Sequence, residues 1–430
     1  TVLSMIAFSA TLYAEVKFSY GGAFRLRQEL WEDVFDLNND LGSGSLADRN
    51  FFRLRTQLWG RADFSEDAGA YLRLVNEAKY YIGPYKPNVP RNDDRLDEDE
   101  LLIDNLYFDI KNIGGLPVDL RIGRQDLIYG EGFLVLDGTP GDGSRTIYFN
   151  AAKLTIKLNE GNSFDVVYLF DPKKDRYLPS LYPSEKKTLN TSDEEGVIVY
   201  GKNKVARNIT IEPYYIYKKE EEWAQPELKL NTIGLRAIFT QDDWKVRGEF
   251  AHQFGEYGGG RDRTGNGGYI FVGRQYRDIN LKPEWDLGYV YLSGDDPDTA
   301  KHEGWNPVFS RWPIYSELYV LTYTIETLKD SALPGYWTNL QLYRANLKLN
   351  FSESVYLSLW YNYLRANEET QGLPPTIFSN DGKARGHLYQ AKLYQKVDKN
   401  LDGYILAEYF DPKDFYADGA DNALFFRWEI

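Results

Sequence analysis

The feature that most constrains the fold of this chain is an alternation of apolar and polar residues that recurs along its whole length. Near the N-terminus, Phe18, Tyr20 and Leu26 take the even positions, whereas Arg25 and Arg27 take odd ones. The same period of two recurs in later segments, among them 52–64, 164–170, 244–254 and 355–363. A period of two is typical of β-strands with one apolar and one polar face. The chain is therefore predicted to be an all-β protein.

The connections between the predicted strands alternate between short and long. Short ones are expected at 65–69, 112–116, 159–162, 241–243, 352–354 and 398–400. Long ones are expected at 32–50, 84–100, 129–144, 171–194, 256–266, 294–334, 367–384 and 411–421. A soluble sandwich could share the alternation within strands, but short periplasmic turns facing long outer loops are typical of transmembrane barrels.

The strand count follows from this pattern of connections. Strands recur often enough for a transmembrane antiparallel β-barrel of about 18 strands in a single domain, 15–430. A count of about 16 stays open, because the segments 196–217 and 269–276 alternate irregularly. The last segment places Leu424, Phe426 and Trp428 on one face, so we expect Glu15 to pair with the C-terminal strand and close the barrel.

Composition supports this fold and excludes several functions. The 430 residues are 16% aromatic, which suits the aromatic girdles at membrane interfaces. After residue 14, no apolar run approaches the roughly 18 residues that a spanning helix needs. A net charge of -14 argues against nucleic acid as a partner, and the absence of cysteine excludes thiolate chemistry.

The first segment, 1–14, has the pattern of the end of a signal peptide. It is an apolar run that ends in small residues, with Ala14 before the polar residue Glu15. The alternative is a short structured N-terminal segment. We expect a secreted chain that is inserted into the bacterial outer membrane.

Three motifs resemble a known family. The first is Gly-Arg-Gln-Asp followed by Tyr-Gly-Glu within 120–131. The second combines 288–297 with 304–309, and the third combines 403–412 with 421–423. In order and spacing they resemble the alginate-export family of outer-membrane barrels. The resemblance implies a monomeric eighteen-stranded barrel with an electropositive lumen, as in exporters of an anionic polysaccharide. It does not imply alginate itself, because many members resemble general porins.

The candidate selectivity residues are basic side chains on the polar face of the first strands. Neighbouring strands lie about 4.8 Å apart, so these side chains can form a ladder that stabilises a carboxylate or phosphate. They are Arg25, Arg27, Arg53, Arg55, Arg61, Arg73, Lys79, Arg121, Lys153 and Lys157. In the alternative, they pair with carboxylates and only solvate the lumen. Those carboxylates are Glu29, Asp63, Glu77, Asp109 and Asp119.

Other chemistry is weakly indicated. Asp295, Asp296 and Asp298 resemble part of a calcium site but lack a full loop signature, and no other cofactor is expected. His252 is expected to face lipid with no serine nearby in its strand, which argues against an enzyme. The glycine-rich segment 257–268 is interpreted as a flexible outer loop.

Together these features predict an outer-membrane porin for passive diffusion of polar, above all anionic, solutes, with oligo- or polysaccharide export included. The alternative is a structural or adhesive surface barrel with a plugged lumen. The connection 294–334 is the natural plug, because it holds the aromatic residues Trp305, Phe309, Trp312, Tyr315 and Tyr319. Expected partners are membrane lipid, lipopolysaccharide and a small anionic or polar solute. A monomer is expected, with an oligomer left open.

Overall fold

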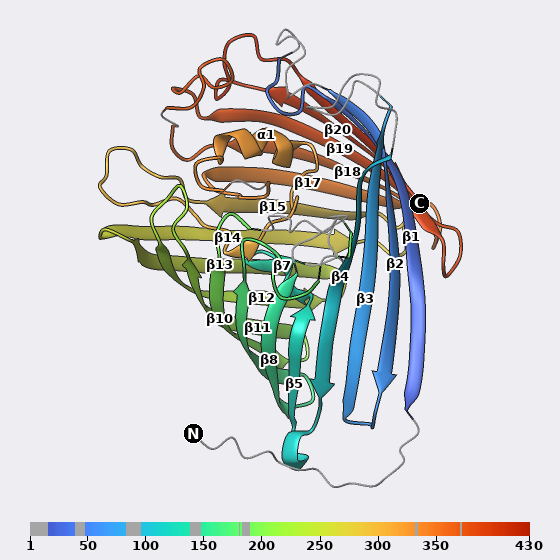
Figure 1. Cartoon of the computed structure of the whole chain (residues 1–430). Helices are drawn as coiled ribbons and strands as arrows, with labels where there is room; N and C mark the ends of the chain where they lie inside the picture. Colours follow the sequence, from blue (N-terminus) through green and yellow to red (C-terminus); the bar gives the residue numbers. More distant parts are fainter. Residues whose placement is uncertain are drawn as a thin grey trace.

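In the computed structural model, most of the chain forms one closed β-sheet (Figure 1). The described residues are 16–38, 48–82, 96–137, 148–179, 181–182, 190–331, 334–369 and 372–430, with only the backbone described for 96–99 and 137. The predicted signal segment 1–14 and Glu15 lie outside them. No helix within the described ranges is long and apolar enough to cross a membrane.

The sheet has 18 antiparallel strands, which confirms the predicted fold class and settles the strand count. Its strands are β1 (Lys17–Glu32), β2 (Arg49–Asp63), β3 (Ala68–Tyr81), β4 (Leu96–Ile110), β5 (Val118–Gln125), β8 (Phe149–Asn159), β9 (Asn162–Asp171), β10 (Glu194–Ala206), β11 (Ile209–Glu220), β12 (Leu228–Gln241), β13 (Trp244–Tyr257), β14 (Arg261–Gln275), β15 (Glu284–Leu292), β17 (Leu340–Asn350), β18 (Val355–Arg365), β19 (Ala384–Lys396), β20 (Asp402–Pro412) and β21 (Ala423–Glu429).

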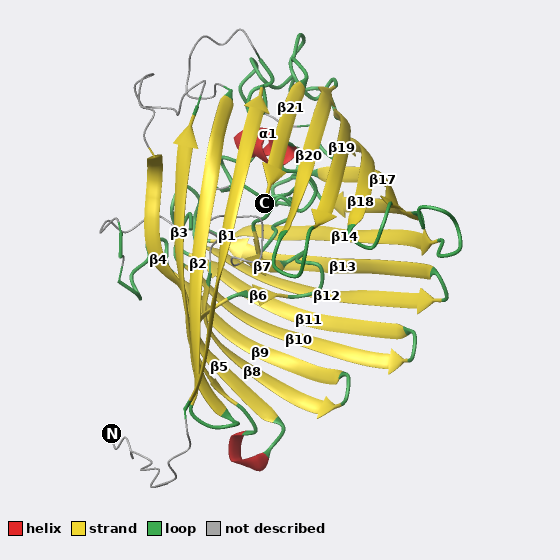
Figure 2. Cartoon of the chain, turned by 90° about the vertical axis from the view of Figure 1, so that its right-hand side faces the viewer, coloured by secondary structure: helices red, strands yellow, loops and turns green. Residues whose placement is uncertain are grey.

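The barrel closes where β1 meets β21, as Figure 2 shows from the side of the C-terminus. The paired residues run from Arg27, opposite Glu429, to Glu32, opposite Leu424. The second half of β1 therefore makes this contact, whereas Glu15, for which the pairing was predicted, lies outside the described residues. Closure satisfies the backbone hydrogen bonds of both strands, as a hydrocarbon environment requires.

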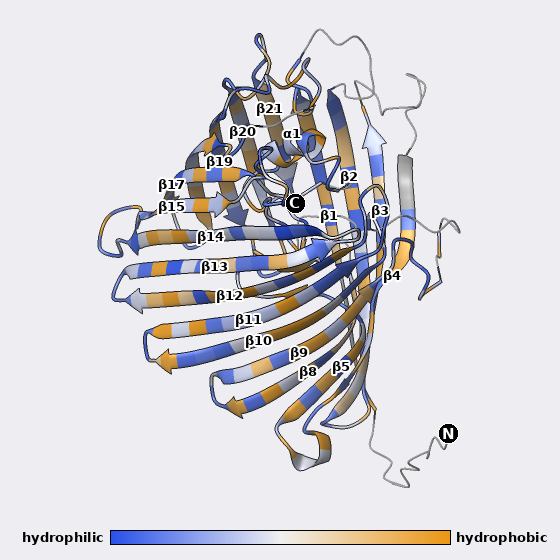
Figure 3. Ribbon diagram, turned by 90° about the vertical axis from the view of Figure 1, so that its left-hand side faces the viewer, coloured by the Kyte–Doolittle hydropathy of each residue, from blue (hydrophilic) through white to orange (hydrophobic). Residues whose placement is uncertain are grey.

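The two faces of the wall follow the predicted alternation. Apolar side chains of the even positions in β1 and β2 are exposed on the outside, with Phe18 at 76% and Leu58 at 59% of their full accessible surface. The odd positions between them carry Arg25 and Arg53, whose side chains are only 11% and 16% exposed. Figure 3 shows the resulting alternation of hydrophobic and hydrophilic residues along the strands. The outer face is thus suited to lipid and the inner face to a polar lumen.

One predicted loop is wrong. The glycine-rich segment 257–268, and with it the long connection 256–266, forms a tight β-hairpin in which β14 begins at Arg261. The glycines let the connection after β15 pack closely against β14. A Cβ atom on Gly267 would lie 2.7 Å from the ring of Trp305, and Gly265 faces the backbone of Gly304. Glycine in a strand often marks such a close approach.

Among the described residues, two connections that carry short strands or a helix fold into the barrel (Figure 1). The first follows β5 and contains β6 (Leu127–Ile128) and β7 (Val135–Asp137). The second follows β15 and contains β16 (Phe309–Ser310) and α1 (Tyr319–Glu326). We call them the first and second inward segments. They join each other, because β7 pairs with β6 on one side and with β16, in parallel, on the other.

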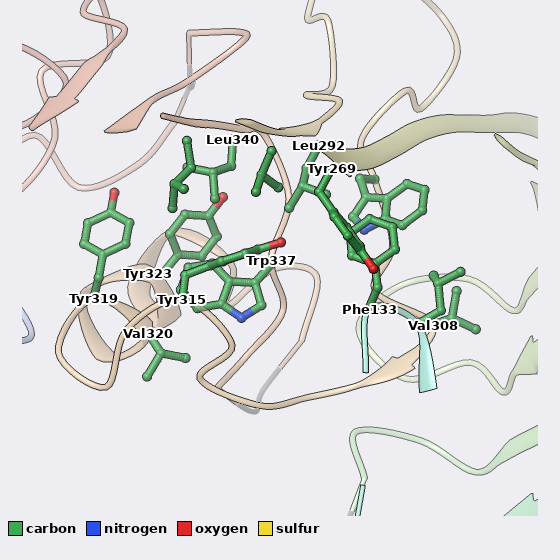
Figure 4. Packing of buried hydrophobic residues seen from close by; sticks show 14 of the residues in the cluster. Phe133, Tyr269, Leu292, Val308, Tyr315, Tyr319, Val320, Tyr323, Trp337 and Leu340 are labelled. Atoms are coloured by element: carbon green, nitrogen blue, oxygen red, sulfur yellow. The ribbon is translucent and has the colours of Figure 1, made fainter. Parts of the chain in front are cut away.

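The hydrophobic core of the described residues lies inside the barrel, between the inward segments and the wall. Figure 4 shows Phe133 of the first segment and Tyr269 of β14 on one side, and Tyr315, Tyr319 and Trp337 on the other. Four of the five aromatic residues of the predicted plug are buried, namely Trp305, Phe309, Tyr315 and Tyr319, and Trp312 is partly buried. The described part of the 294–334 connection therefore lies inside the barrel, and whether it plugs the lumen stays a prediction.

Candidate pore-lining site

The Gly-Arg-Gln motif directs the first inward segment off the wall. Gly123 has a φ of 129° and lies against the Leu106 carbonyl, where a side chain would collide. Arg124 is buried and binds Asp175 through Nη2 at 2.6 Å, and Gln125 donates to the Ala151 carbonyl at 3.1 Å. These contacts hold the end of β5, where the chain leaves the sheet.

The basic side chains of β1 and β2 face one another directly across the strand pair. Arg25 is opposite Arg55, Arg27 is opposite Arg53, and Arg53 is in turn opposite Lys79 of β3. Like charges at directly opposed positions destabilise a sheet. The predicted ladder therefore exists as a geometric feature, and the wall needs carboxylates beside it to offset the repulsion.

The carboxylates of this wall are shared between several arginines. Glu29 is fully buried, and its Oε1 lies 2.6 Å from Arg27, 3.1 Å from Arg427 and 3.7 Å from Arg53. Glu429 is shared in the same way, at 3.7 Å from Arg25 and 3.6 Å from Arg27. Arg27 is itself fully buried and supports the wall, whereas Arg25 and Arg53 keep partial exposure to the lumen.

Ion pairs also engage several of the other predicted residues. Arg61 and Arg121 both bind Asp109, at 2.9 and 2.7 Å. The other ion pairs of the set are Arg61–Asp63, Arg73–Asp104, Arg73–Asp126, Lys153–Asp165, Lys157–Asp119 and Arg53–Glu77. All five carboxylates of the charge-compensation alternative are thus engaged with predicted basic residues. A selectivity role for these residues stays a prediction.

The arrangement also contains basic residues that the sequence reasoning missed. Arg427 of β21 joins the β1 cluster through Glu29, because closure brings the last strand beside the first. Arg236 and Arg247 project from β12 and β13 and clasp Glu131 of the first inward segment, at 3.1 and 3.0 Å. Their polar-face positions were visible in the sequence, but their partner in a distant loop was not.

A buried ion pair attaches the second inward segment to the nearby strand β19 of the wall. Arg385 of β19 binds Glu326 of α1 with two contacts, Nη1 to Oε2 at 2.6 Å and Nη2 to Oε1 at 2.7 Å. At the other end of α1, the carboxylate of Glu408 accepts the N–H of Leu318 at 2.9 Å and the hydroxyl of Ser316. A carboxylate at a helix N-terminus is stabilising, so both ends of the helix are anchored.

The three aspartates of the calcium prediction do not share a ligand position. Asp295 accepts the N–H of Glu303 at 2.8 Å and lies 3.5 Å from Arg261. Asp296 instead accepts the N–H of Asp298 at 2.9 Å within its own turn. Over the described ranges, no group of three acidic, histidine or cysteine side chains converges on one point.

A closed eighteen-stranded wall with an apolar outside, a charged inside and inward-folded connections defines an outer-membrane porin type of barrel. Within that class, the model of the alginate export family matches residues 17–429, so the chain belongs to that family. No functionally curated protein matches the sequence.

Solved structures from Pseudomonas aeruginosa share the fold. OpdO is 14% identical with a TM-score of 0.59, over 95% of each chain. OccK9 (OpdG) is 10% identical with a TM-score of 0.59, over 95% of this chain and 97% of that one. OccK2 (OpdF), solved in complex with glucuronate, is 10% identical with a TM-score of 0.56, over 96% of this chain and 98% of that one.

Proposed function

We propose that this protein is an outer-membrane channel through which anionic solutes diffuse passively, with the basic wall of β1–β3 setting the preference for anions. The observation that carries the proposal is the direct opposition of Arg25 to Arg55, two guanidinium groups that line the same cavity. Like charges at opposed positions do not by themselves stabilise a sheet, whereas an anion in that cavity gains charge-assisted contacts. Membership of the alginate export family and the glucuronate complex of OccK2 support an acidic solute.

The residues that act on the solute are expected to be the accessible ones. Arg25 and Arg55 line a cavity of about 280 Å³ together with Lys392, Tyr404 and Glu429. Low-dielectric walls strengthen the field of such groups, while carboxylates in the outer loops are screened by salt beyond about 8–10 Å. Charge on the wall therefore outweighs the negative net charge of the chain.

The test is the reversal potential of single channels in a salt gradient. Replacing Arg25 and Arg55 together by Ser should move the reversal potential toward cation preference. As a matched control, Arg277→Ser removes a guanidinium that is 66% exposed and pairs with Asp243, away from this wall, and should change nothing. A wild-type channel that already prefers cations, with no change in the double variant, would refute the proposal.

The second candidate is a structural or adhesive surface barrel with a plugged lumen. The observation in its favour is the buried core that the inward segments form inside the barrel. Conductance separates the two functions, because a plugged barrel in a planar bilayer passes no steady current. The proposal includes a monomer surrounded by membrane lipid and lipopolysaccharide, which cross-linking in outer-membrane vesicles tests.

A further inference from the structure

Three aromatic side chains form a row on the inner face of neighbouring strands. Trp59 of β2 stacks on Tyr71 of β3, with ring centroids 6.2 Å apart and 22° between the planes. Tyr71 stacks on Tyr107 of β4 at 5.0 Å and 19°, and the guanidinium of Arg121 lies 4.0 Å from the centroid of Tyr107. All three aromatic side chains are partly buried, so each keeps surface toward the lumen.

The wall is shaped to hold this row. Gly21 of β1 lies opposite Trp59, and a Cβ atom there would stand 2.5 Å from the indole ring. The ring of Trp59 therefore rests on a strand that has no side chain at that position. Among the described residues, the indole N–H of Trp59 and the hydroxyl of Tyr107 make no hydrogen bond with protein, which leaves a donor at one end of the row and a hydroxyl at the other.

Charged groups surround the row on the side of the short turns. A cavity of about 830 Å³, within the size range of small-molecule sites, adjoins the row through Arg61, which is opposite Tyr71, and Arg121, which lies over Tyr107; the three aromatic residues themselves do not line it. Its charged lining residues are Lys17, Arg61, Asp63, Glu66, Asp109, Lys111 and Arg121. Arg61 pairs with Asp63 and Asp109, and Arg121 pairs with Asp109; the two arginine side chains are 22% and 38% exposed, so part of each guanidinium still faces the cavity.

Cross-strand aromatic pairs stabilise sheets without any ligand, but this row faces a polar lumen and carries polar groups without protein partners. The face of a pyranose ring is a patch of C–H groups edged by hydroxyls, which fits an aromatic surface edged by hydrogen-bonding groups. We propose that Trp59, Tyr71 and Tyr107 form a stacking subsite for a pyranose ring, with Arg61 and Arg121 placed to meet a carboxylate on that ring. The subsite rests on the proposed function as an anion channel and specifies where a saccharide binds.

The experiment uses blockade of single-channel current in planar bilayers by a tetrasaccharide of 1,4-linked galacturonic acid, added in turn to each side. The double variant Trp59→Leu and Tyr71→Leu keeps apolar bulk but removes the rings. Loss of the stacking contacts should weaken blockade roughly 3- to 10-fold. Tyr356→Leu is the matched control, because Tyr356 stacks on Tyr394 at 4.9 Å outside the row and should leave blockade unchanged.

The outcomes distinguish this subsite from the proposed function. Weaker blockade in the double variant, with an unchanged reversal potential, supports the subsite. Unchanged blockade in a channel that keeps its anion preference overturns the subsite alone. Equal weakening by the double variant and by Tyr356→Leu overturns it as well, because the row would then be one aromatic surface among others. A wild-type channel without anion preference refutes the proposed function first, whatever the blockade shows.

Discussion

The buried pair between Arg385 and Glu326 offers the sharpest test of how the lumen is narrowed. Arg385 is fully buried and the side chain of Glu326 is 6% exposed, so Arg385→Met leaves an uncompensated carboxylate under α1. Breaking a buried pair in this way costs about 3–5 kcal/mol. That loss raises the undocked population of the second inward segment roughly 100- to 4,000-fold.

Two measurements report undocking. Open-channel current should become noisy, with excursions to higher conductance, and trypsin should cut after the exposed Lys329 just beyond α1. The matched control is Lys383→Met, which removes a pair with Glu368 at 3.3 Å whose side chains are 31% and 36% exposed. A pair that exposed contributes about 1 kcal/mol at most, so the control should behave like the wild type.

A double variant distinguishes the specific loss of this ion pair from a general folding defect. Replacing Arg385 by Met and Glu326 by Leu together removes both charges, and apolar replacement of a whole buried pair is often neutral. The double variant should regain quiet current and resistance to trypsin. If Arg385→Met is as quiet and as resistant as Lys383→Met, the pair does not hold the helix, and the anchoring described here is wrong.

Two further predictions concern the wall and the outer rim. Leu58→Arg on the lipid face should lower the unfolding free energy of the barrel by about 2–4 kcal/mol in liposome unfolding titrations. Ser19→Asp on the lumen face should lower it little. Equal losses of unfolding free energy would refute the assignment of the two faces. Burial and the nearby Asp48 raise the pKa of Asp33 to about 6 from its ordinary 3.8. The folded state then holds the proton more tightly, so the unfolding free energy should fall as pH rises from about 4 to about 6 and then level off. Asp33→Asn should remove the contribution of Asp33 and so reduce the fall in unfolding free energy between these pH values, and an unchanged pH profile in this variant would contradict the assignment.

The faces of the wall could be predicted because a period of two is a local property of each strand. The same local reasoning failed in the hairpin of β13 and β14. Glycines lower strand propensity, so 257–268 was interpreted as a loop. The glycines are there because Trp305, from a connection much later in the chain, needs the space that Gly267 leaves. No spacing within the segment carries that information.

The candidate site was predictable to a similar degree. The arginines of β1 and β2 were assigned to the inner face together, and alternation could not separate the buried Arg27 from the partly exposed Arg53. That difference depends on Arg427, which reaches Glu29 only when the last strand closes on the first. The burial of Arg385 could likewise not be predicted from the sequence, because its partner Glu326 lies in an inward segment.

The short parallel pairing of β7 with β16 has a consequence for the order of assembly. Val135 is opposite Phe309, and the connections that carry them leave the wall at β5 and β15, with many strands between them in either direction. A contact between distant parts of the chain carries a loop-closure entropy cost, which the wall reduces by fixing the two places where the connections leave it. We therefore expect the aromatic interior to become ordered together with the wall strands between β5 and β15, or after them, rather than before them.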